Sequence, residues 1–338
     1  MTRPTIRYRY QEILWGGEAQ RRLGASRVAV FGVGGTGAAC AEVLARAGVG
    51  VLRLIDRDVV EVSDLHRTLL YDAHDAANPI PKVEAAARRI AALNADVKVE
   101  AVMAYVVADN AKALAEDADV IVDGSDNFLL RLILNDVAVA TGRPMVYQGA
   151  VAERGAVMAV VPGSGPCLRC LITDEVIGLG VPTCSQIGVS PGVVAATGGW
   201  GAEVTLALLR GQPENVAGRL TSFSAGRAVT LRVERRPDCP ACGRGEYDFL
   251  GGRYNPDVGV VCGGCAFEVF PRYRGKILLS EIGARLAHKY KVSMGDKVLS
   301  VIVNAGVSAV LMEDGRALVY GPASAQEAET IYRRVFGL

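Results

Sequence analysis

The chain is poor in histidine and has no excess of either charge. Only 3 of its 338 residues are histidine, and 37 lysines and arginines balance 36 aspartates and glutamates. So few histidines argue against histidine-rich metal sites and serine-hydrolase arrangements. The charge balance argues against bulk binding to nucleic acid or to a membrane surface, because one sign of charge should dominate there.

Long apolar runs are also missing. No run reaches the ~18 residues that span a membrane, and the opening residues MTRPTIRYRYQEIL lack the apolar stretch of a signal peptide. We therefore expect a cytoplasmic protein without a membrane segment. Hydrophobic residues make up 50% of the chain, enough for a sizeable core. The length predicts roughly two domains of ~150 residues each.

The start of the chain predicts a doubly wound α/β nucleotide-binding fold. An apolar strand over 27–31 runs into a glycine-rich turn, followed by an alanine-rich helix over 38–48 and a strand over 51–55. Glycines let the backbone approach a nucleotide, and the helix N-terminus offers free N–H groups to phosphate. The turn supplies the candidate phosphate-binding residues Gly32, Gly34, Gly35 and Gly37. Asp56, at the next strand end, can accept hydrogen bonds from ribose hydroxyls.

The rest of the chain predicts two domains, 1–245 and 246–338. In the first we expect helices over 7–23, 81–93, 127–140 and 199–210, and strands over 98–103, 118–123, 144–149 and 156–161. Residues 162–198, rich in Gly, Pro, Cys and Thr, predict a long irregular crossing. The second is expected to be a small α+β domain. It has a surface hairpin at Asp314-Gly315-Arg316 and a capping box, Ser324 to Glu327, ahead of a final helix.

Two cations and a carboxylate add phosphate chemistry to the glycine turn. Arg67 and Lys82 can neutralise phosphate oxygens. Asp126 follows a predicted strand end, where ligands of open parallel sheets bind, and can hold Mg²⁺; its alternative role is to cap the helix that starts at Asn127. The combination favours phosphoryl or nucleotidyl transfer. Hydride transfer by a nicotinamide dehydrogenase, the competing interpretation, needs no magnesium.

These motifs resemble those of the E1-like superfamily, in the branch of the ThiF, MoeB and HesA proteins. Besides the glycine turn they are Asp56-Arg57-Asp58, Ser63-Asp64-Leu65-His66-Arg67, Pro81-Lys82-Val83 and Asp123-Gly124-Ser125-Asp126-Asn127. The resemblance covers residues 5–243. It implies an adenylyltransferase that uses MgATP to adenylate the C-terminal glycine of a ubiquitin-like sulfur carrier ending in Gly-Gly. It also implies a homodimer and a sulfur donor such as a cysteine desulfurase or a rhodanese.

The resemblance also assigns residues. It implies that MgATP contacts the glycine turn and Asp56, Asp58, Ser63, Asp64, Arg67, Lys82, Asp126 and Asn127. Arg67, Lys82 and Asp126 would be catalytic, with Asp126 linked to magnesium. The chain departs from the family twice. Asp64 stands where the family has asparagine, and Tyr10-Gln11 stands where the family has an Arg-Gln dipeptide that serves the ATP site of the dimer mate. Arg9 or Arg7 is a nearby substitute.

Six of the eight cysteines form three C-x-x-C pairs, two of which can close a Cys₄ zinc site. By spacing, the pair Cys239/Cys242 can join either Cys167/Cys170 or Cys262/Cys265. The family resemblance favours the first, because Pro166-Cys167-Leu168-Arg169-Cys170 matches the family; zinc would then pin the crossing segment. Cys262/Cys265 would be a redox or sulfur-relay pair, or two small buried residues.

The two single cysteines predict different roles. Cys40, inside the first helix of the fold, is expected in the core. Cys184 lies in the crossing, where the resemblance implies thioester or sulfur chemistry, because a thiolate can attack an acyl-adenylate.

Several alternatives stay open at this stage. The same superfamily includes enzymes that adenylate a small-molecule or tRNA-linked carboxylate, and a non-catalytic adaptor could keep the fold and bind a ubiquitin-like partner. The pathway is also open between thiamine, molybdopterin, tRNA thiolation and protein conjugation.

Overall fold

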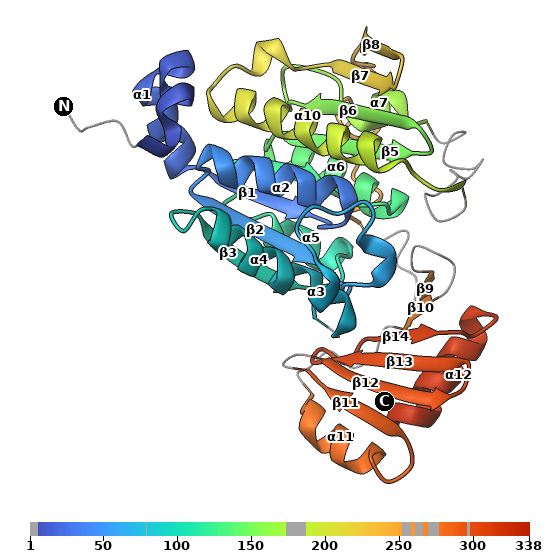
Figure 1. Cartoon of the computed structure of the whole chain (residues 1–338). Coiled ribbons are helices and arrows are strands. Elements are labelled where there is room, and N and C mark those ends of the chain that lie inside the picture. The colour runs from blue at the N-terminus through green and yellow to red at the C-terminus, as the bar shows by residue number, and fades with distance from the viewer. Residues whose placement is uncertain are drawn as a thin grey trace. The chain divides into compact units, whose positions relative to one another are not determined.

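The computed structural model describes residues 6–78, 80–173, 187–251, 258–260, 266–269, 277–295 and 298–338. These residues belong to two compact units. The first contains the described residues up to 251 apart from Ile187, drawn from blue to yellow-brown in Figure 1. The second contains Ile187 and the described residues from 258 onward.

An eight-stranded sheet forms the centre of the first unit (Figure 1), in the order β3-β2-β1-β4-β5-β6-β7-β8. The strands are β1 (Arg27–Phe31), β2 (Val51–Asp56), β3 (Lys98–Met103), β4 (Val120–Asp123), β5 (Met145–Val151), β6 (Arg154–Val160), β7 (Arg219–Ser224) and β8 (Arg227–Arg232). The first five in this order are parallel and the last three join antiparallel. Since β1 lies between β2 and β4, the strand order reverses there, which is where open α/β sheets bind ligands.

Helices cover both faces of this sheet. They are α1 (Arg9–Ala25), α2 (Gly35–Ala47), α3 (Ala73–Ala77), α4 (Lys82–Leu93), α5 (Ala108–Leu114), α6 (Phe128–Thr141), α7 (Leu168–Leu171) and α10 (Pro191–Leu209). Alternate residues of β1 point to opposite faces. Val28 and Val30 pack with α2, α4 and α10, whereas Ala29 and Phe31 pack with α5 and α6. The predicted doubly wound fold is confirmed, although the short helices α3 and α5 were not predicted.

The expected irregular crossing over 162–198 is wrong at both ends. Residues 168–171 form α7, and α10 begins at Pro191, eight residues before the predicted start. Pro191 occupies the first turn of α10, where a missing N–H is tolerated. A Cβ on Gly198 would lie 2.5 Å from the Thr36 carbonyl oxygen, so this glycine permits close packing of α10 on α2. By length and composition α10 alone among the described helices could span a membrane, but most of it is buried in this unit.

The described residues of the second unit form an antiparallel sheet and two helices, as expected for a small α+β domain. The strand order is β11-β12-β13-β14-β10-β9. The elements are β9 (Val258–Val260), β10 (Ala266–Val269), α11 (Leu279–Leu286), β11 (Lys291–Met294), β12 (Val298–Asn304), β13 (Val307–Met312), β14 (Ala317–Tyr320) and α12 (Ala325–Phe336). Ser324 caps α12 through the Glu327 amide, at 3.2 Å, as predicted.

The predicted surface hairpin between β13 and β14 is only partly at the surface. Arg316 is 5% exposed, because its guanidinium pairs with the fully buried Glu268 at 2.6 Å. Asp314 binds the same guanidinium at 2.6 Å and remains half-exposed. A charged residue after a turn signal therefore belongs here to a buried ion pair.

Candidate functional site

The turn between β1 and α2 is closed on one side and open on the other. Gly32 has a φ of 86°, and a Cβ on it would lie 2.8 Å from the Ser125 amide nitrogen. A Cβ on Gly37 would overlap the Gly32 carbonyl oxygen. In contrast, a Cβ on Gly34 would meet no atom within 4 Å. The glycines at 32 and 37 thus allow the turn to pack, and Gly34 faces open space.

The N-terminus of α2 has the properties of an anion site. Gly34 is its N-cap residue, no side chain caps it, and its first turn holds no acidic residue. The first N–H groups of a helix have no acceptor within the helix, and the dipole favours negative charge there. Gly35 begins the helix, and a Cβ on it would overlap the Val194 side chain of α10. The site fits phosphate at the open side of Gly34.

Asp56, at the end of β2, supports the turn. One carboxylate oxygen accepts a hydrogen bond from the Val33 amide at 2.7 Å, and the other accepts from the Asp58 amide at 2.8 Å. Burial, together with the nearby Asp58 carboxylate, raises the pKa of Asp56 to about 6. Asp56 therefore fixes the turn through both of its carboxylate oxygens, and its predicted contact with a ribose stays a prediction.

Both predicted cations lie against carboxylates at this edge of the sheet. Lys82 Nζ is 3.5 Å from Asp58 Oδ2 and 3.4 Å from Asp64 Oδ2. Arg67 Nη2 is 2.9 Å from Asp64 Oδ1. Burial lowers the pKa of Lys82, but the Asp58 and Asp64 carboxylates outweigh it and raise the pKa well above its usual value. Lys82 therefore stays charged, as phosphate binding requires.

Asn127 caps helix α6, and its neighbour Asp126 is left exposed. The Asn127 side chain caps α6 by accepting from the Leu130 amide at 3.0 Å, so Asp126 is not the cap. Asp126 is exposed and makes no hydrogen bond or ion pair with another described residue; its charge acts on Lys82. An exposed carboxylate close enough to a buried lysine to act on its charge fits magnesium, which binds oxygen ligands together with phosphates. Ser63, also exposed, donates to Glu61 at 3.1 Å and lies four residues before Arg67.

Two supporting residues escaped the sequence analysis. Arg131 of α6 binds the fully buried Asp123 at 2.8 Å and donates to the Ser125 carbonyl at 2.9 Å, so it fixes the loop that carries Asp126. Tyr71 donates to the Val33 carbonyl at 2.6 Å. The Tyr71 contact has no local sequence signal, because Tyr71 and Val33 are 38 residues apart. Arg131 follows Asp123 by 8 residues and Ser125 by 6, so its role depends on how the loop before α6 folds back.

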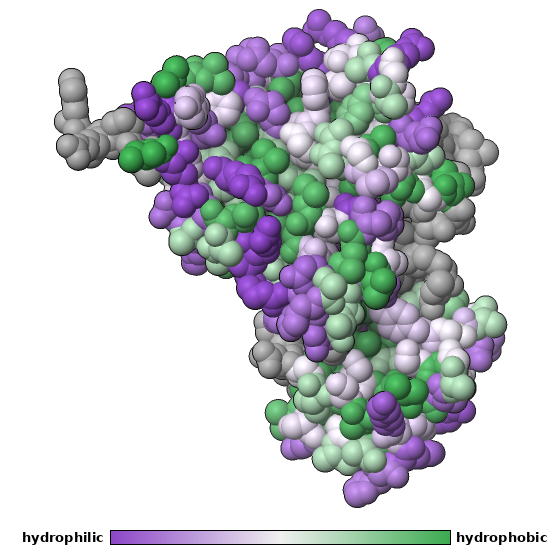
Figure 2. Space-filling model, viewed as in Figure 1, coloured by the Kyte–Doolittle hydropathy of each residue, from purple (hydrophilic) through white to green (hydrophobic). Residues whose placement is uncertain are grey.

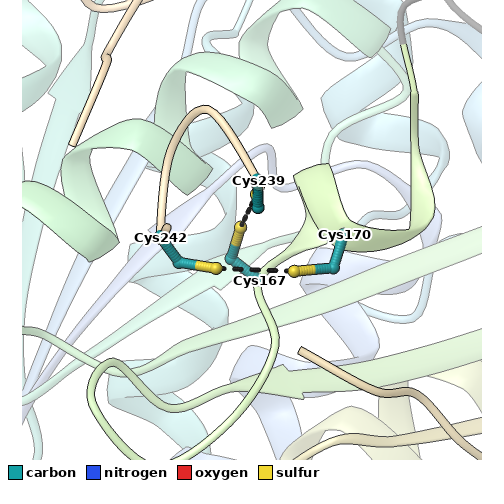
Figure 3. A group of neighbouring side chains, drawn as sticks. All are labelled: Cys167, Cys170, Cys239 and Cys242. Atoms are coloured by element: carbon teal, nitrogen blue, oxygen red, sulfur yellow. Dashed lines mark hydrogen bonds between the residues drawn. The ribbon is translucent and has the colours of Figure 1, made fainter. Parts of the chain in front are cut away.

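Cys167, Cys170, Cys239 and Cys242 come together beside α6, as Figure 3 shows. Their four sulfur atoms all lie within 4.8 Å of one another. The sulfurs of Cys167 and Cys239 are 3.6 Å apart, and those of Cys170 and Cys242 are 3.4 Å apart. A tetrahedral site with Zn–S bonds of ~2.3 Å needs sulfurs roughly 3.8 Å apart. The long-range grouping of the two pairs therefore fits zinc.

The thiols of this cluster form hydrogen bonds with one another across the two pairs. Hydrogen bonds from the Cys167 and Cys170 thiols lower the pKa of Cys239. Hydrogen bonds with Cys170 and Cys239 raise the pKa of Cys167. Thiolates are the form that binds metal, so zinc binding to this cluster would release protons.

Helix α6 holds both cysteine-bearing segments in place. Asn135 accepts from the Leu168 amide at 2.8 Å, next to Cys167. Asp136 accepts from the Phe249 amide at 3.0 Å and the Leu250 amide at 3.3 Å, which anchors the chain after Cys242. The same helix starts next to the loop that carries Asp126. It therefore links the cysteine cluster to the edge of the sheet where Lys82 and Asp126 lie.

Three predicted residues lie outside the described part of the chain. These are Cys184, Cys262 and Cys265. Cys40 is fully buried in α2, and burial raises the pKa of its thiol to about 12, in keeping with the expected core role.

Comparison with known proteins identifies the family. The model of the ThiF family matches residues 8–241, which include the glycine turn, both cations, Asp126 and three of the four clustered cysteines; Cys242 is the next residue. The chain belongs to the ThiF family. Among relatives of this ThiF-family chain, the sulfur carrier protein ThiS adenylyltransferase of Bacillus subtilis is 34% identical over 98% of the chain and 100% of its own length. The SAMP-activating enzyme E1 of Haloferax volcanii is 39% identical over 70% of the chain and 87% of its own length.

Solved structures agree on the fold. Escherichia coli MccB superposes with a TM-score of 0.63 at 20% identity, over 72% of this ThiF-family chain and 74% of MccB. PaaA superposes with a TM-score of 0.58 at 24% identity, over 68% of the chain and 73% of PaaA. At these identities the likeness establishes the architecture alone.

Proposed function

We propose that this protein is an adenylyltransferase that activates the C-terminal glycine of a ubiquitin-like sulfur carrier. The observation that carries the proposal is the grouping of Lys82, Arg67 and the exposed Asp126 with the open, uncapped N-terminus of α2. A nicotinamide dehydrogenase has no need of this set. The relatives named above, whose names specify adenylation of sulfur carriers or activation as an E1, support the same reaction.

In the proposed reaction a carboxylate oxygen of the carrier attacks the α-phosphorus of ATP. The bond from that phosphorus to the bridging oxygen breaks, and pyrophosphate leaves. Lys82 and Arg67 stabilise the charge that develops on the phosphate oxygens, together with the amides at the start of α2. Asp126 would hold Mg²⁺, which supplies further charge neutralisation and orients the phosphates. Asp56 is positioned for the ribose hydroxyls.

A structural zinc ion held by Cys167, Cys170, Cys239 and Cys242 is part of the proposal. With four protein ligands such a site is closed, so zinc would contribute stability rather than activate water. It would tie the start of the crossing segment to the end of the first unit. The thiolate of Cys184, in that crossing, would attack the carbonyl carbon of the acyl-adenylate, forming a thioester and releasing AMP. A cysteine desulfurase or rhodanese would then donate the sulfur.

We also propose a cytoplasmic homodimer. Helix α1 exposes Ile13, Leu14 and Tyr10, and Figure 2 shows hydrophobic residues among the hydrophilic ones in this region. Arg7 donates to the Leu93 carbonyl at 3.0 Å. Arg9 is exposed without a partner among the described residues, so it is the better candidate for the arginine that the family supplies to the dimer mate's ATP site.

The test is ATP–pyrophosphate exchange with Mg²⁺, with and without a ubiquitin-like carrier ending in Gly-Gly. We expect exchange to depend on the carrier and to be lost in Lys82→Ala. Exchange that depends on a small-molecule carboxylate instead would show that the protein is one of the enzymes that adenylate small molecules. ATP binding without any exchange would indicate a non-catalytic adaptor.

A further inference from the structure

Two successive peptide groups in the glycine turn are held by side chains from other parts of the chain. The Val33 N–H donates to Asp56 Oδ2 at 2.7 Å. The Val33 carbonyl accepts from the Tyr71 hydroxyl at 2.6 Å. Since Asp56 is the last residue of β2 and Tyr71 precedes α3, two separate parts of the chain hold the turn.

The Tyr71 contact sets the direction of the next amide. The Val33 carbonyl and the Gly34 N–H belong to one peptide group, which is planar and trans, so they point in opposite directions. With its oxygen fixed on Tyr71, this peptide aims the Gly34 N–H away from Tyr71. Gly34 faces open space and is the uncapped N-cap residue of α2.

We propose that Tyr71 is a positioning residue for nucleotide binding, whose hydroxyl orients the Gly34 amide toward a phosphate of ATP. The inference rests on the proposed function and deepens it at the same site. Rotating this peptide would turn its carbonyl oxygen toward the phosphate, so an acceptor would replace a donor. The Tyr71 hydrogen bond opposes that rotation.

The residues packed around Tyr71 hold its side chain in place and keep its hydroxyl protonated. Its side chain is 8% exposed and packs in the core that includes Val33 and α2. Burial, with the carboxylates of Asp56, Asp64 and Asp58, raises the pKa of Tyr71 well above its usual value, so the hydroxyl remains a donor at any physiological pH. Tyr71 lies four residues after Arg67, so one short segment both supplies a cation and orients the turn.

The variant Tyr71→Phe removes the hydroxyl and keeps the ring. If Tyr71 served only folding, its loss would weaken the binding of every ligand of the site equally. If it orients the Gly34 amide, its loss would weaken only the binding of ligands that carry a phosphate. We therefore expect the dissociation constant for ATP to rise about tenfold, as for the loss of one net hydrogen bond, and that for adenosine to stay unchanged. The measurement is calorimetric titration with ATP and with adenosine, beside thermal unfolding.

Tyr8→Phe is the matched control. The Tyr8 hydroxyl also makes one hydrogen bond, accepting from the Asn94 side chain at 2.8 Å, away from the turn. This variant should bind both ligands like the wild type. Equal weakening of ATP and adenosine in Tyr71→Phe, or no weakening of ATP, would overturn the inference.

The outcome separates this inference from the proposed function. If the wild type binds ATP but supports no exchange with any carrier, the proposed function fails, and the ratio of ATP to adenosine affinity still decides the role of Tyr71. If the wild type binds no ATP, both fail.

Discussion

Lys82 Nζ lies 3.4 Å from the Asp64 carboxylate, which is 1% exposed. The same carboxylate binds Arg67 at 2.9 Å. From the sequence alone, an aspartate in place of the family's asparagine should repel phosphate. The contacts give it another role, because it sits between the two cations proposed to bind ATP and neutralises part of their charge when no nucleotide is present.

Replacing Asp64 should therefore change the protein with and without ATP differently. Asp64→Asn keeps an acceptor but removes the charge from a buried ion pair, so we expect the free protein to lose about 2 kcal/mol of stability. Without the Asp64 charge, Lys82 and Arg67 should interact more strongly with the triphosphate, so ATP should stabilise the variant more. The shift in melting temperature caused by saturating MgATP should be larger in the variant than in the wild type.

Asp96→Asn controls for the loss of a carboxylate, because Asp96 is exposed and has no ion pair among the described residues. It should leave stability and the ATP-induced shift unchanged. A smaller ATP-induced shift in Asp64→Asn than in the wild type would show that Asp64 assists nucleotide binding directly.

The cysteine cluster predicts one zinc ion per chain. Cys239→Ser should abolish bound zinc and lower the melting temperature, because the ligand set that joins two distant segments would be broken. Elemental analysis of purified protein measures the zinc. Cys262→Ser should retain it, whereas loss of zinc in that variant would favour the alternative pairing of Cys239/Cys242 with Cys262/Cys265.

Asp136 should make stability depend on pH. Burial raises its pKa to about 6, while the Leu250 and Phe249 amides lower it. Because the folded pKa exceeds the unfolded one, stability from this group is fully present below about pH 4 and is lost as the pH rises through about 6. Urea unfolding measured well below pH 4 and well above pH 6 should show a loss of unfolding free energy about 3 kcal/mol larger in the wild type than in Asp136→Asn. Equal losses in the two proteins would show that burial does not raise the pKa of Asp136. Titration of the cysteine cluster cancels in this comparison, because both proteins contain it.

The proposed dimer can be tested on α1. Leu14→Glu places a charge on the exposed apolar side of this helix, so we expect the dimer dissociation constant to rise about 100-fold. Light scattering after gel filtration measures the mass. Glu18→Gln, on the same helix, should leave the mass unchanged. A wild-type monomer at all concentrations would rule out the dimer.

Local patterns were enough for most of the α/β unit. The strand over 27–31, the turn at Gly32 and the helix after it follow from an apolar run, glycines and alanines that all favour one structure. The start of α10 could not be predicted from local patterns, because proline and glycine are typical of loops. Pro191 is tolerated because it stands in the first turn of the helix, and Gly198 is needed because Thr36 of α2 packs against it. Both reasons depend on the folded structure.

The candidate site shows the same division. Lys82, Arg67 and Asp126 were predicted because each stands in a recognisable motif, and the structure brings the cations and carboxylates to one edge of the sheet. Tyr71 and Arg131 were not predicted, because their roles depend on backbone atoms of distant segments. The pairing of Asp64 with both cations likewise required the positions of two separate elements.

The most direct test of the central claim is to observe the activated carrier itself. The protein would be incubated with MgATP and a ubiquitin-like carrier ending in Gly-Gly, and the carrier's intact mass measured. We expect an added adenylyl group with the wild type, about 100-fold less with Lys82→Ala, and none on a carrier lacking the last glycine. An unmodified Gly-Gly carrier with the wild type, under conditions in which ATP is bound, would show that the protein does not adenylate such carriers.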